Sequence, residues 1–308
     1  MRFRALSPMA GASHLAPTPK PVEVTAGEWA IRSDFDHLSR SRFVNTLSMV
    51  GASGDVSVEL ADDFVATVEI HRPPDNYIDV AVVAALADAY EELARDRTCR
   101  SIVLCSEGRH FSAGVAFAGG GAAADGELLR SGAFYREAVR LFGPSLPVVA
   151  AVQGAAVGGG LGLALAADFR VAGEASRFWA NFARLGFHHG FGMTVTLPAV
   201  VGQQAALDLL YTGRRLRGEE ALALGLCDRL VPNDRIRAEA RALAAEIAGS
   251  APLAVRAIRE TLRGDLAERI RAATEREQAE QARLMQTDDF REGVRAVSER
   301  RQPQFEGR

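Results

Sequence analysis

Two glycine-rich turns carry the residues in this chain whose types and spacing best suit chemistry. Residues 108–114 read Gly-Arg-His-Phe-Ser-Ala-Gly and follow an apolar segment at 102–105, and residues 154–160 read Gly-Ala-Ala-Val-Gly-Gly-Gly and follow the apolar segment Val148–Val152. Glycine permits sharp turns that leave backbone N–H groups accessible, and the first N–H groups of a helix attract negative charge. Two such turns at neighbouring strand ends could aim two N–H groups at one developing oxyanion. The alternative is that the glycines only permit tight turns and close helix–sheet packing.

The sequence does not contain the spacing of other short motifs for nucleotide binding, hydrolysis or metal binding. The run Gly158 to Gly162 does not place glycines at the first, third and sixth positions of a dinucleotide fingerprint. The chain has no Gly-Lys-Ser/Thr, no Gly-x-Ser-x-Gly and no His-Glu-x-x-His, and its six histidines show no metal-ligand spacing. Cys99, Cys105 and Cys227 lack metal or redox spacing, which predicts small buried side chains in a reducing compartment. The sequence therefore predicts no metal site.

Composition narrows the class of protein. Apolar residues make up 48% and charged residues 24%, which is typical of a soluble globular protein. The net charge of −3 indicates no obligatory nucleic-acid or membrane partner, so an anionic substrate would have to meet local basic residues. No apolar run approaches the roughly 20 residues of a membrane span, and no apolar block follows Arg2 and Arg4. We expect a cytoplasmic protein.

Alternating strands and helices must position the two turns. Hydrophobic periodicity predicts the following elements: strands at 56–60 and 65–70, a helix at 80–94, a strand at 102–105, a helix at 127–141, a strand at 148–152, a helix at 161–168 and a strand at 169–172. This order predicts an α/β fold with right-handed βαβ units. Beyond residue 200 only helices are predicted, with no strands between them: 205–212, 218–224, 234–247, 252–263, 267–284 and 289–300.

Three regions follow from these patterns. Residues 1–48 contain four prolines and little periodicity, which predicts a poorly ordered extension, and Met49 could be an alternative start. Residues 49–200 form the α/β core, and 201–308 form a helical region that we expect to pack on a partner subunit. The Gly-Gly-Gly-Ala-Ala-Ala stretch at 119–124 predicts a mobile surface loop.

The two turns also resemble a known family. The patterns Gly108-x-x-Phe111-Ser112-Ala113-Gly114 and Pro147-Val-Val-Ala-Ala-Val-x-Gly154-x-x-x-Gly158-Gly159-Gly160 resemble the two signature segments of the crotonase (enoyl-CoA hydratase/isomerase) superfamily. His71-Arg72-Pro73-Pro74-x-Asn76, the segment at 166–172, and the tail Asp289-Phe290-x-Glu292-Gly293 are further matches. The resemblance covers about residues 56 to 308.

The resemblance implies a fold, a substrate class and site residues. It implies a crotonase-type spiral of ββα repeats with a C-terminal helical layer for oligomerisation, assembled as a trimer or a dimer of trimers. It implies binding of acyl-CoA thioesters, with no cofactor beyond the coenzyme A of the substrate. By position, the two oxyanion N–H donors fall on Ala113 and Gly159. The remaining substrate-contacting positions are Arg72, Asn76, Phe111, Gly114, Gly158, Gly162 and Phe182.

Several positions depart from that family's pattern. The two glutamates that hold water in the family's hydratases are here Gly162 and Phe182. The nucleophilic aspartate of its thioester dehalogenases is Gly190, and the usual aspartate after the first segment is Ala116. Glycine has no proton to give and phenylalanine makes a dry wall, so two-glutamate hydration is not predicted.

Other acid–base groups must then be considered. His188 and His189 follow Phe182 on a loop, and related decarboxylases place a tyrosine at position 189, so either ring could move a proton. Alternatively, the histidines only hold a backbone turn. Tyr135 and Glu137 are second candidates, and Tyr135 could instead be a core residue.

Three functions remain in competition. The first is an acyl-CoA enzyme that stabilises a thioester enolate, with isomerase-, lyase- or decarboxylase-like chemistry. The second is a non-catalytic acyl-CoA-binding or scaffold protein, and the third is an enoyl-CoA hydratase with displaced acid/base groups.

Overall fold

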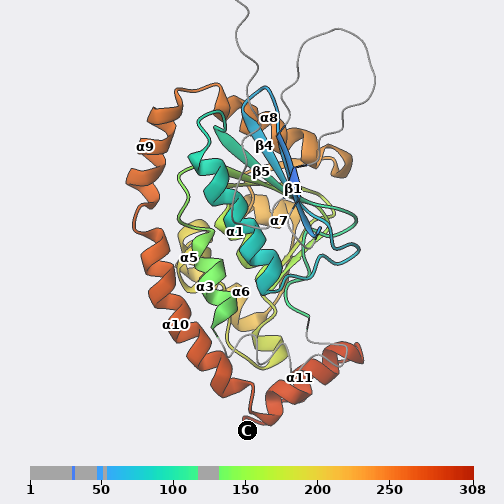
Figure 1. The fold of residues 1–308 in the computed structure, drawn as a ribbon. Helices are drawn as coiled ribbons and strands as arrows, with labels where there is room; N and C mark the ends of the chain where they lie inside the picture. Colours follow the sequence, from blue (N-terminus) through green and yellow to red (C-terminus); the bar gives the residue numbers. More distant parts are fainter. Residues whose placement is uncertain (1–29, 32–46, 51–53, 117–131) are drawn as a thin grey trace, which may run out of the picture.

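The computed structural model describes residues 30–31, 47–50, 54–116 and 132–308 (Figure 1). The predicted loop at 119–124, the first residues of the helix predicted at 127–141 and most of the predicted extension lie outside these ranges. Among the described residues, no helix is long and apolar enough to cross a bilayer.

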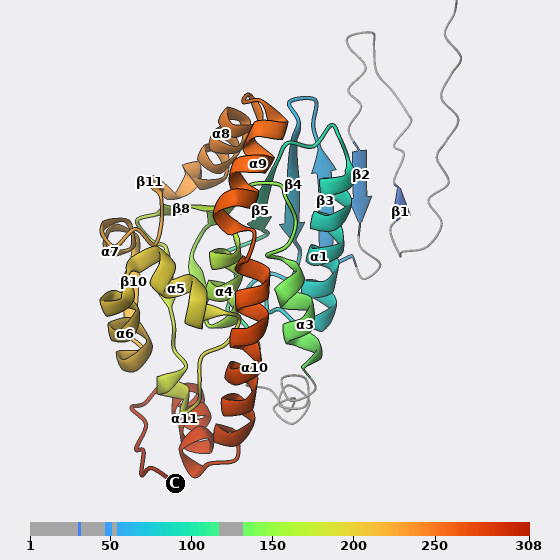
Figure 2. The same cartoon turned by 90° about the vertical axis from the view of Figure 1, so that its left-hand side faces the viewer.

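Within the described residues, eight strands form one mixed sheet. Their order is β1 (Ala30–Ile31), β2 (Leu47–Val50), β3 (Val56–Leu60), β4 (Val65–Ile70), β5 (Ser101–Ser106), β6 (Val148–Val152), β8 (Phe169–Gly173) and β11 (Arg229–Val231). Strands β1 to β4 pair antiparallel, and β4 to β11 pair parallel. Figure 2 shows β5 to β1 succeeding one another toward one edge. Strand β1 and the start of β2 therefore lie within the segment predicted as an extension.

A second, smaller sheet extends the end of β6. It contains β7 (Ala155–Val157), β9 (Arg177–Trp179) and β10 (Arg215–Arg217). Strands β10 and β11 show that the prediction of helices alone after residue 200 was wrong. A three-residue strand is too short to carry a period-two pattern, and Arg215 and Arg217 are exposed.

Helices cover both faces of the large sheet. On one face lie α1 (Val80–Arg95), α3 (Ala133–Arg140) and α4 (Gly159–Ala166), and their apolar residues join one large core cluster. On the other face α8 (Ile236–Ala248) packs against β5, β6 and β8 through a second cluster. Both β5 and β6 are buried at every position, and residues 102–105 and 148–152 read as continuous apolar runs. The carboxyl ends of these two parallel strands place the glycine-rich turns side by side.

The remaining helices wrap the core. They are the short η1 (Ala183–Leu185) and η2 (Asn233–Arg235), and α5 (Met193–Val201), α6 (Gln203–Thr212), α7 (Gly218–Ala223), α9 (Pro252–Arg263), α10 (Leu266–Leu284) and α11 (Asp288–Ser298). Figure 1 shows α9 and α10 following one another down one side of the molecule. Helix α10 contacts α3 and α5, which brings a distant part of the chain to the glycine-rich turns.

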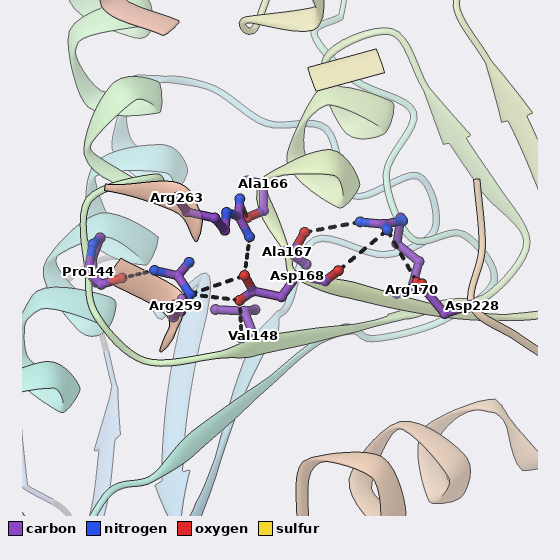
Figure 3. A network of polar contacts seen from close by, with 9 residues as sticks. All are labelled: Pro144, Val148, Ala166, Ala167, Asp168, Arg170, Asp228, Arg259 and Arg263. Carbon is purple, nitrogen blue, oxygen red and sulfur yellow. Dashed lines mark hydrogen bonds and ion pairs between the residues drawn. The ribbon is translucent and has the colours of Figure 1, made fainter. Parts of the chain in front are cut away.

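An ion-pair network anchors α9 to the core (Figure 3). Asp168, at the start of β8, accepts hydrogen bonds from the Arg259 Nε at 3.0 and 3.1 Å and from Arg263. The same carboxylate accepts the Val148 N–H at 2.8 Å. Asp168 is therefore a structural residue that holds α9 against the start of β8.

Candidate active site at the ends of β5 and β6

The structure brings the two glycine-rich turns into direct contact. The Ser112 N–H donates to the Ala155 carbonyl at 3.0 Å, and the Val157 N–H donates to the Ser112 carbonyl at 3.0 Å. A methyl group on Gly114 would lie 2.5 Å from the Val157 carbonyl oxygen and 3.1 Å from the Gly159 nitrogen. The backbones approach so closely that only glycine fits at position 114, where φ is +83°.

Asn76 holds the first turn in place from a fully buried position. Its side-chain amide donates to the Glu107 carbonyl at 2.8 Å and to the His110 carbonyl at 2.7 Å. Its Oδ1 accepts the Arg72 N–H at 3.0 Å. All these partners belong to the protein backbone, so Asn76 acts as a positioning residue. The Arg72 guanidinium is paired with Asp55 at 2.9 Å and with Asp79 at 2.7 Å.

The backbone hydrogen bonds correct one predicted oxyanion donor. The Ala113 N–H donates to the Asp75 carbonyl at 2.8 Å, so it is not available to a substrate oxygen. Val115, two residues further along, lines the adjacent cavity together with Gly159. Among the described residues, neither the Val115 N–H nor the Gly159 N–H has an acceptor. Gly159 is the first residue of α4, where N–H groups lack intrahelical partners.

The cavity between these N–H groups and α10 is small, at about 50 Å³. One side is the turns themselves, and the opposite wall is largely aromatic and aliphatic: Phe134, Leu185, Phe187, Phe191 and Phe182. Its polar side chains are Tyr135, Asn181 and Gln281. None of the described residues that line this cavity carries a carboxylate or an imidazole.

Phe191 fills the space beside Gly162. A Cβ on Gly162 would lie 2.4 Å from the Phe191 Cβ, so no larger side chain fits there. Phe182 lines the cavity and packs against Phe187 with their ring centroids 5.5 Å apart. Both positions that the resemblance assigns to hydratase glutamates thus lie in apolar surroundings.

Gly190 is equally constrained. A Cβ at this position would lie 2.1 Å from the Tyr135 hydroxyl and 2.8 Å from the Gln281 Nε2. An aspartate at position 190 would therefore collide with two side chains.

His188 and His189 stack with their ring centroids 4.1 Å apart, and neither lines the cavity. The Thr194 hydroxyl donates to the Glu277 carboxylate at 2.6 Å, so it accepts the Nε2–H of His189 at 2.9 Å. Burial, together with the charge of His188, lowers the pKa of His189 from 6.5 to about 3. Glu277 lies 3.9 Å from His189 Nε2, but its oxygens already accept the Gly192 and Thr194 N–H groups. His189 is therefore a neutral ring that holds its loop against α10.

Tyr135 and Glu137 leave α3 in different directions. The Tyr135 hydroxyl donates to the Gln281 Oε1 at 2.6 Å at the cavity wall, and burial raises the pKa of Tyr135 well above its usual range. Glu137 is not part of the cavity lining and pairs with Arg140 at 2.6 Å. The structure brings Tyr135, but not Glu137, to the two N–H groups.

Three site residues were missed from the sequence. Val115 lies two positions from the predicted donor, and only the hydrogen bond of Ala113 distinguishes them. Gln281 lies in a charged stretch of α10, and nothing in that pattern indicates a cavity whose other lining residues are 90 or more positions away in sequence. Asn181 adjoins Phe182, which is the one sequence signal that could have found it.

Comparisons with known proteins identify the family and the fold. Residues 61–308 match the family model described as Enoyl-CoA hydratase/isomerase. A probable enoyl-CoA hydratase of Bacillus subtilis (strain 168) is 34% identical over 251 residues, covering 80% of this chain and 96% of the relative. A carnitinyl-CoA dehydratase of Salmonella heidelberg (strain SL476) is 32% identical over 251 residues, covering 79% and 95%. A crystal structure of an enoyl-CoA hydratase/isomerase from Pseudoalteromonas atlantica T6c superposes with a TM-score of 0.72 at 30% identity, covering 82% of this chain and 100% of that chain.

Proposed function

Because the chain belongs to the enoyl-CoA hydratase/isomerase family, we propose that this acyl-CoA enzyme stabilises a thioester enolate with the N–H groups of Val115 and Gly159. Negative charge builds on the thioester oxygen when a bond to the α-carbon breaks. Two N–H groups held rigidly beside that oxygen lower the energy of the transition state, since they need no reorganisation when the charge appears.

One observation carries the choice of reaction: two residues with available N–H groups line a cavity whose described lining contains no carboxylate and no imidazole. Isomerisation needs a base for the α-proton, and hydration needs a base for water. Loss of a carboxylate from the α-carbon needs neither, because the electrons of the breaking carbon–carbon bond form the enolate and carbon dioxide leaves. We therefore favour a decarboxylase-like lyase acting on a malonyl-type thioester.

The enolate must then take up a proton at the α-carbon. Tyr135 is the candidate donor, because its hydroxyl is at the cavity wall and its raised pKa keeps it protonated. The apolar wall favours the first step, since a carboxylate loses hydration there while the product carbon dioxide is neutral. Solvent would return the proton to Tyr135.

The first experiment compares substrates, and the second removes one of the two N–H groups. Malonyl-, methylmalonyl-, crotonyl- and 3-enoyl-CoA are incubated with the purified chain and the products are separated by chromatography. We expect decarboxylation of a malonyl-type thioester and no hydration of crotonyl-CoA. Tight binding without turnover of any thioester would favour an acyl-CoA-binding protein. Fast hydration of crotonyl-CoA would overturn the argument from Gly162 and Phe182.

The matched variants are Gly159→Pro and Gly159→Ala. Proline is tolerated at the first position of a helix and removes the N–H, whereas alanine keeps it. A Cβ at position 159 would lie 3.4 Å from the nearest side-chain atom, so the alanine variant has room. We expect Gly159→Pro to lose about 10²–10³ in rate relative to Gly159→Ala. Equal rates would contradict the assignment of this donor.

We also propose that the outer face of α9 packs on another copy of the chain, giving the trimer or dimer of trimers. Leu253, Ile258 and Leu262 are 80%, 60% and 76% exposed on α9, while Arg259 and Arg263 point inward to Asp168. An apolar stripe left outside supports an interface. Light scattering of Ile258→Glu/Leu262→Glu should show a smaller particle than the wild type, and an unchanged mass would contradict this interface.

A further inference from the structure

The Asn181 carboxamide is a polar side chain of the cavity that is bonded to neither of the other two. Asn181 is 9% exposed and lines the cavity. No hydrogen bond joins its side chain to another described residue, although its atoms are not among the fully buried side-chain atoms without a partner. The other two polar side chains of the lining, Tyr135 and Gln281, are bonded to each other at 2.6 Å.

The backbone around Asn181 fixes where this amide lies. Asn181 stands between β9 and η1, and its carbonyl accepts the Leu185 N–H at 3.1 Å. A Cβ on Gly158 would lie 3.3 Å from Asn181 Oδ1, so the carboxamide sits beside the start of α4. The Gly158 N–H cannot satisfy it, because that group donates to the Trp179 carbonyl at 2.9 Å.

A largely buried amide without a protein partner is unfavourable for folding, because it gives up part of its hydrogen bonding to water and gains none from the protein. Leucine has nearly the same volume and would suit the surrounding phenylalanines better. An amide at this apolar wall is therefore explained by a ligand that provides the missing hydrogen bond.

We propose that Asn181 determines specificity by donating a hydrogen bond to a carboxylate on the α-carbon of the bound thioester. This inference rests on the proposed function, since a thioester whose oxygen meets the Gly159 N–H would have its α-carbon in the cavity that Gly158 and Asn181 also line. A carboxylate only accepts hydrogen bonds, and the Asn181 side-chain amide offers two N–H donors. A neutral amide orients the carboxylate without the ion pair that would stabilise it against loss of carbon dioxide.

The experiment measures binding separately from turnover. Stopped-flow titrations give the dissociation constants of malonyl-CoA and butyryl-CoA, which differ in the carboxylate, for the wild type and for Asn181→Leu. We expect the wild type to prefer malonyl-CoA, and Asn181→Leu to weaken malonyl-CoA binding about 10-fold or more while butyryl-CoA binding changes less than about 3-fold. An equal effect on both ligands, or a wild type without preference, would overturn the proposal.

Asn181→Asp provides the second variant, since it is nearly isosteric and keeps the polar character of the site. Its carboxylate should repel the carboxylate of malonyl-CoA and leave butyryl-CoA binding unchanged, so unaltered malonyl-CoA binding would also overturn the proposal.

The proposed reaction and the proposed role of Asn181 are refuted by different results. Malonyl-CoA that binds through Asn181 without being decarboxylated refutes the proposed reaction only, and malonyl-CoA that is decarboxylated equally well by Asn181→Leu refutes the role of Asn181 only.

Discussion

Phe191 occupies the space into which any side chain at position 162 would have to extend. A Cβ on Gly162 would lie 2.4, 2.6 and 2.8 Å from three carbon atoms of Phe191. Phe191 itself has a φ of +62°, a conformation that bulky residues rarely adopt, and it is fully buried. The contact between Gly162 and Phe191, where α4 packs against the loop before α5, leaves no room for a carboxylate side chain at position 162.

A glutamate restored at position 162 should therefore destabilise the fold. We expect Gly162→Glu to lower the free energy of unfolding by more than about 3 kcal/mol, from overpacking and from a buried unpaired charge. Adding Phe191→Gly should recover part of this loss, because it opens space and relieves the positive φ. Urea unfolding of Gly162→Glu, Phe191→Gly and the double variant measures this non-additivity. A Gly162→Glu protein as stable as the wild type would show that the contact is easily relieved.

Asn76 should hold the first glycine-rich turn, residues 108–114, in its folded conformation. Asn76→Ala removes the two donors to Glu107 and His110 and places alanine at a φ of +48°. Asn76→Gly removes the same bonds and tolerates that φ. We expect both to lose roughly 2–3 kcal/mol of stability, with alanine about 1 kcal/mol worse than glycine. Faster amide hydrogen exchange at 107–115 in both variants would confirm the positioning role, and unchanged exchange there would contradict it.

The ion pairs of Asp168 should matter far more than an exposed pair. Asp168→Asn weakens the attachment of Arg259 and Arg263, whose partner carboxylate is 11% exposed. Breaking a buried pair typically costs about 3–5 kcal/mol. Asp63, which pairs with Arg241 at the surface, is the control, and Asp63→Asn should cost less than about 1 kcal/mol. Chemical denaturation compares the two, and equal effects would contradict the anchoring of α9 by Asp168.

His189 should make the protein less stable in mild acid. Its folded pKa of about 3 is below its ordinary value, so between pH 6.5 and 3 the unfolded chain binds a proton that the folded chain does not. The contribution of His189 to the free energy of unfolding is fully present above pH 6.5. It falls as the pH decreases, by about 2 kcal/mol at pH 5. His189→Gln can still donate to Thr194 without titrating, whereas His188 and Glu277, which face the ring, remain in both proteins.

The measurement is the free energy of unfolding of both proteins at pH 7.5 and pH 5. The wild type should lose more stability than His189→Gln over this interval. A larger loss in the variant would mean that the attraction of Glu277 for a protonated ring exceeds the effect of burial.

Most of the order of elements and the meeting of the two glycine-rich turns followed from local patterns in the sequence. The apolar runs of β5 and β6 and the glycines at 114 and 158–160 gave the α/β core and the meeting point of two turns, because burial and tight approach leave direct traces in composition. The family membership followed from the same residues. The short strands β10 and β11 left no such trace.

The identity of the groups in the cavity was decided by tertiary structure. Nothing local distinguishes the N–H of Ala113 from that of Val115, and the choice depends on the Asp75 carbonyl, 38 residues away, accepting the former. Gln281 reaches the cavity only because Asp168 anchors α9 and α10 continues past α3 and α5. Backbone donors and long-range side chains are assigned by where their partners lie in space, and spacing along the chain does not contain that information.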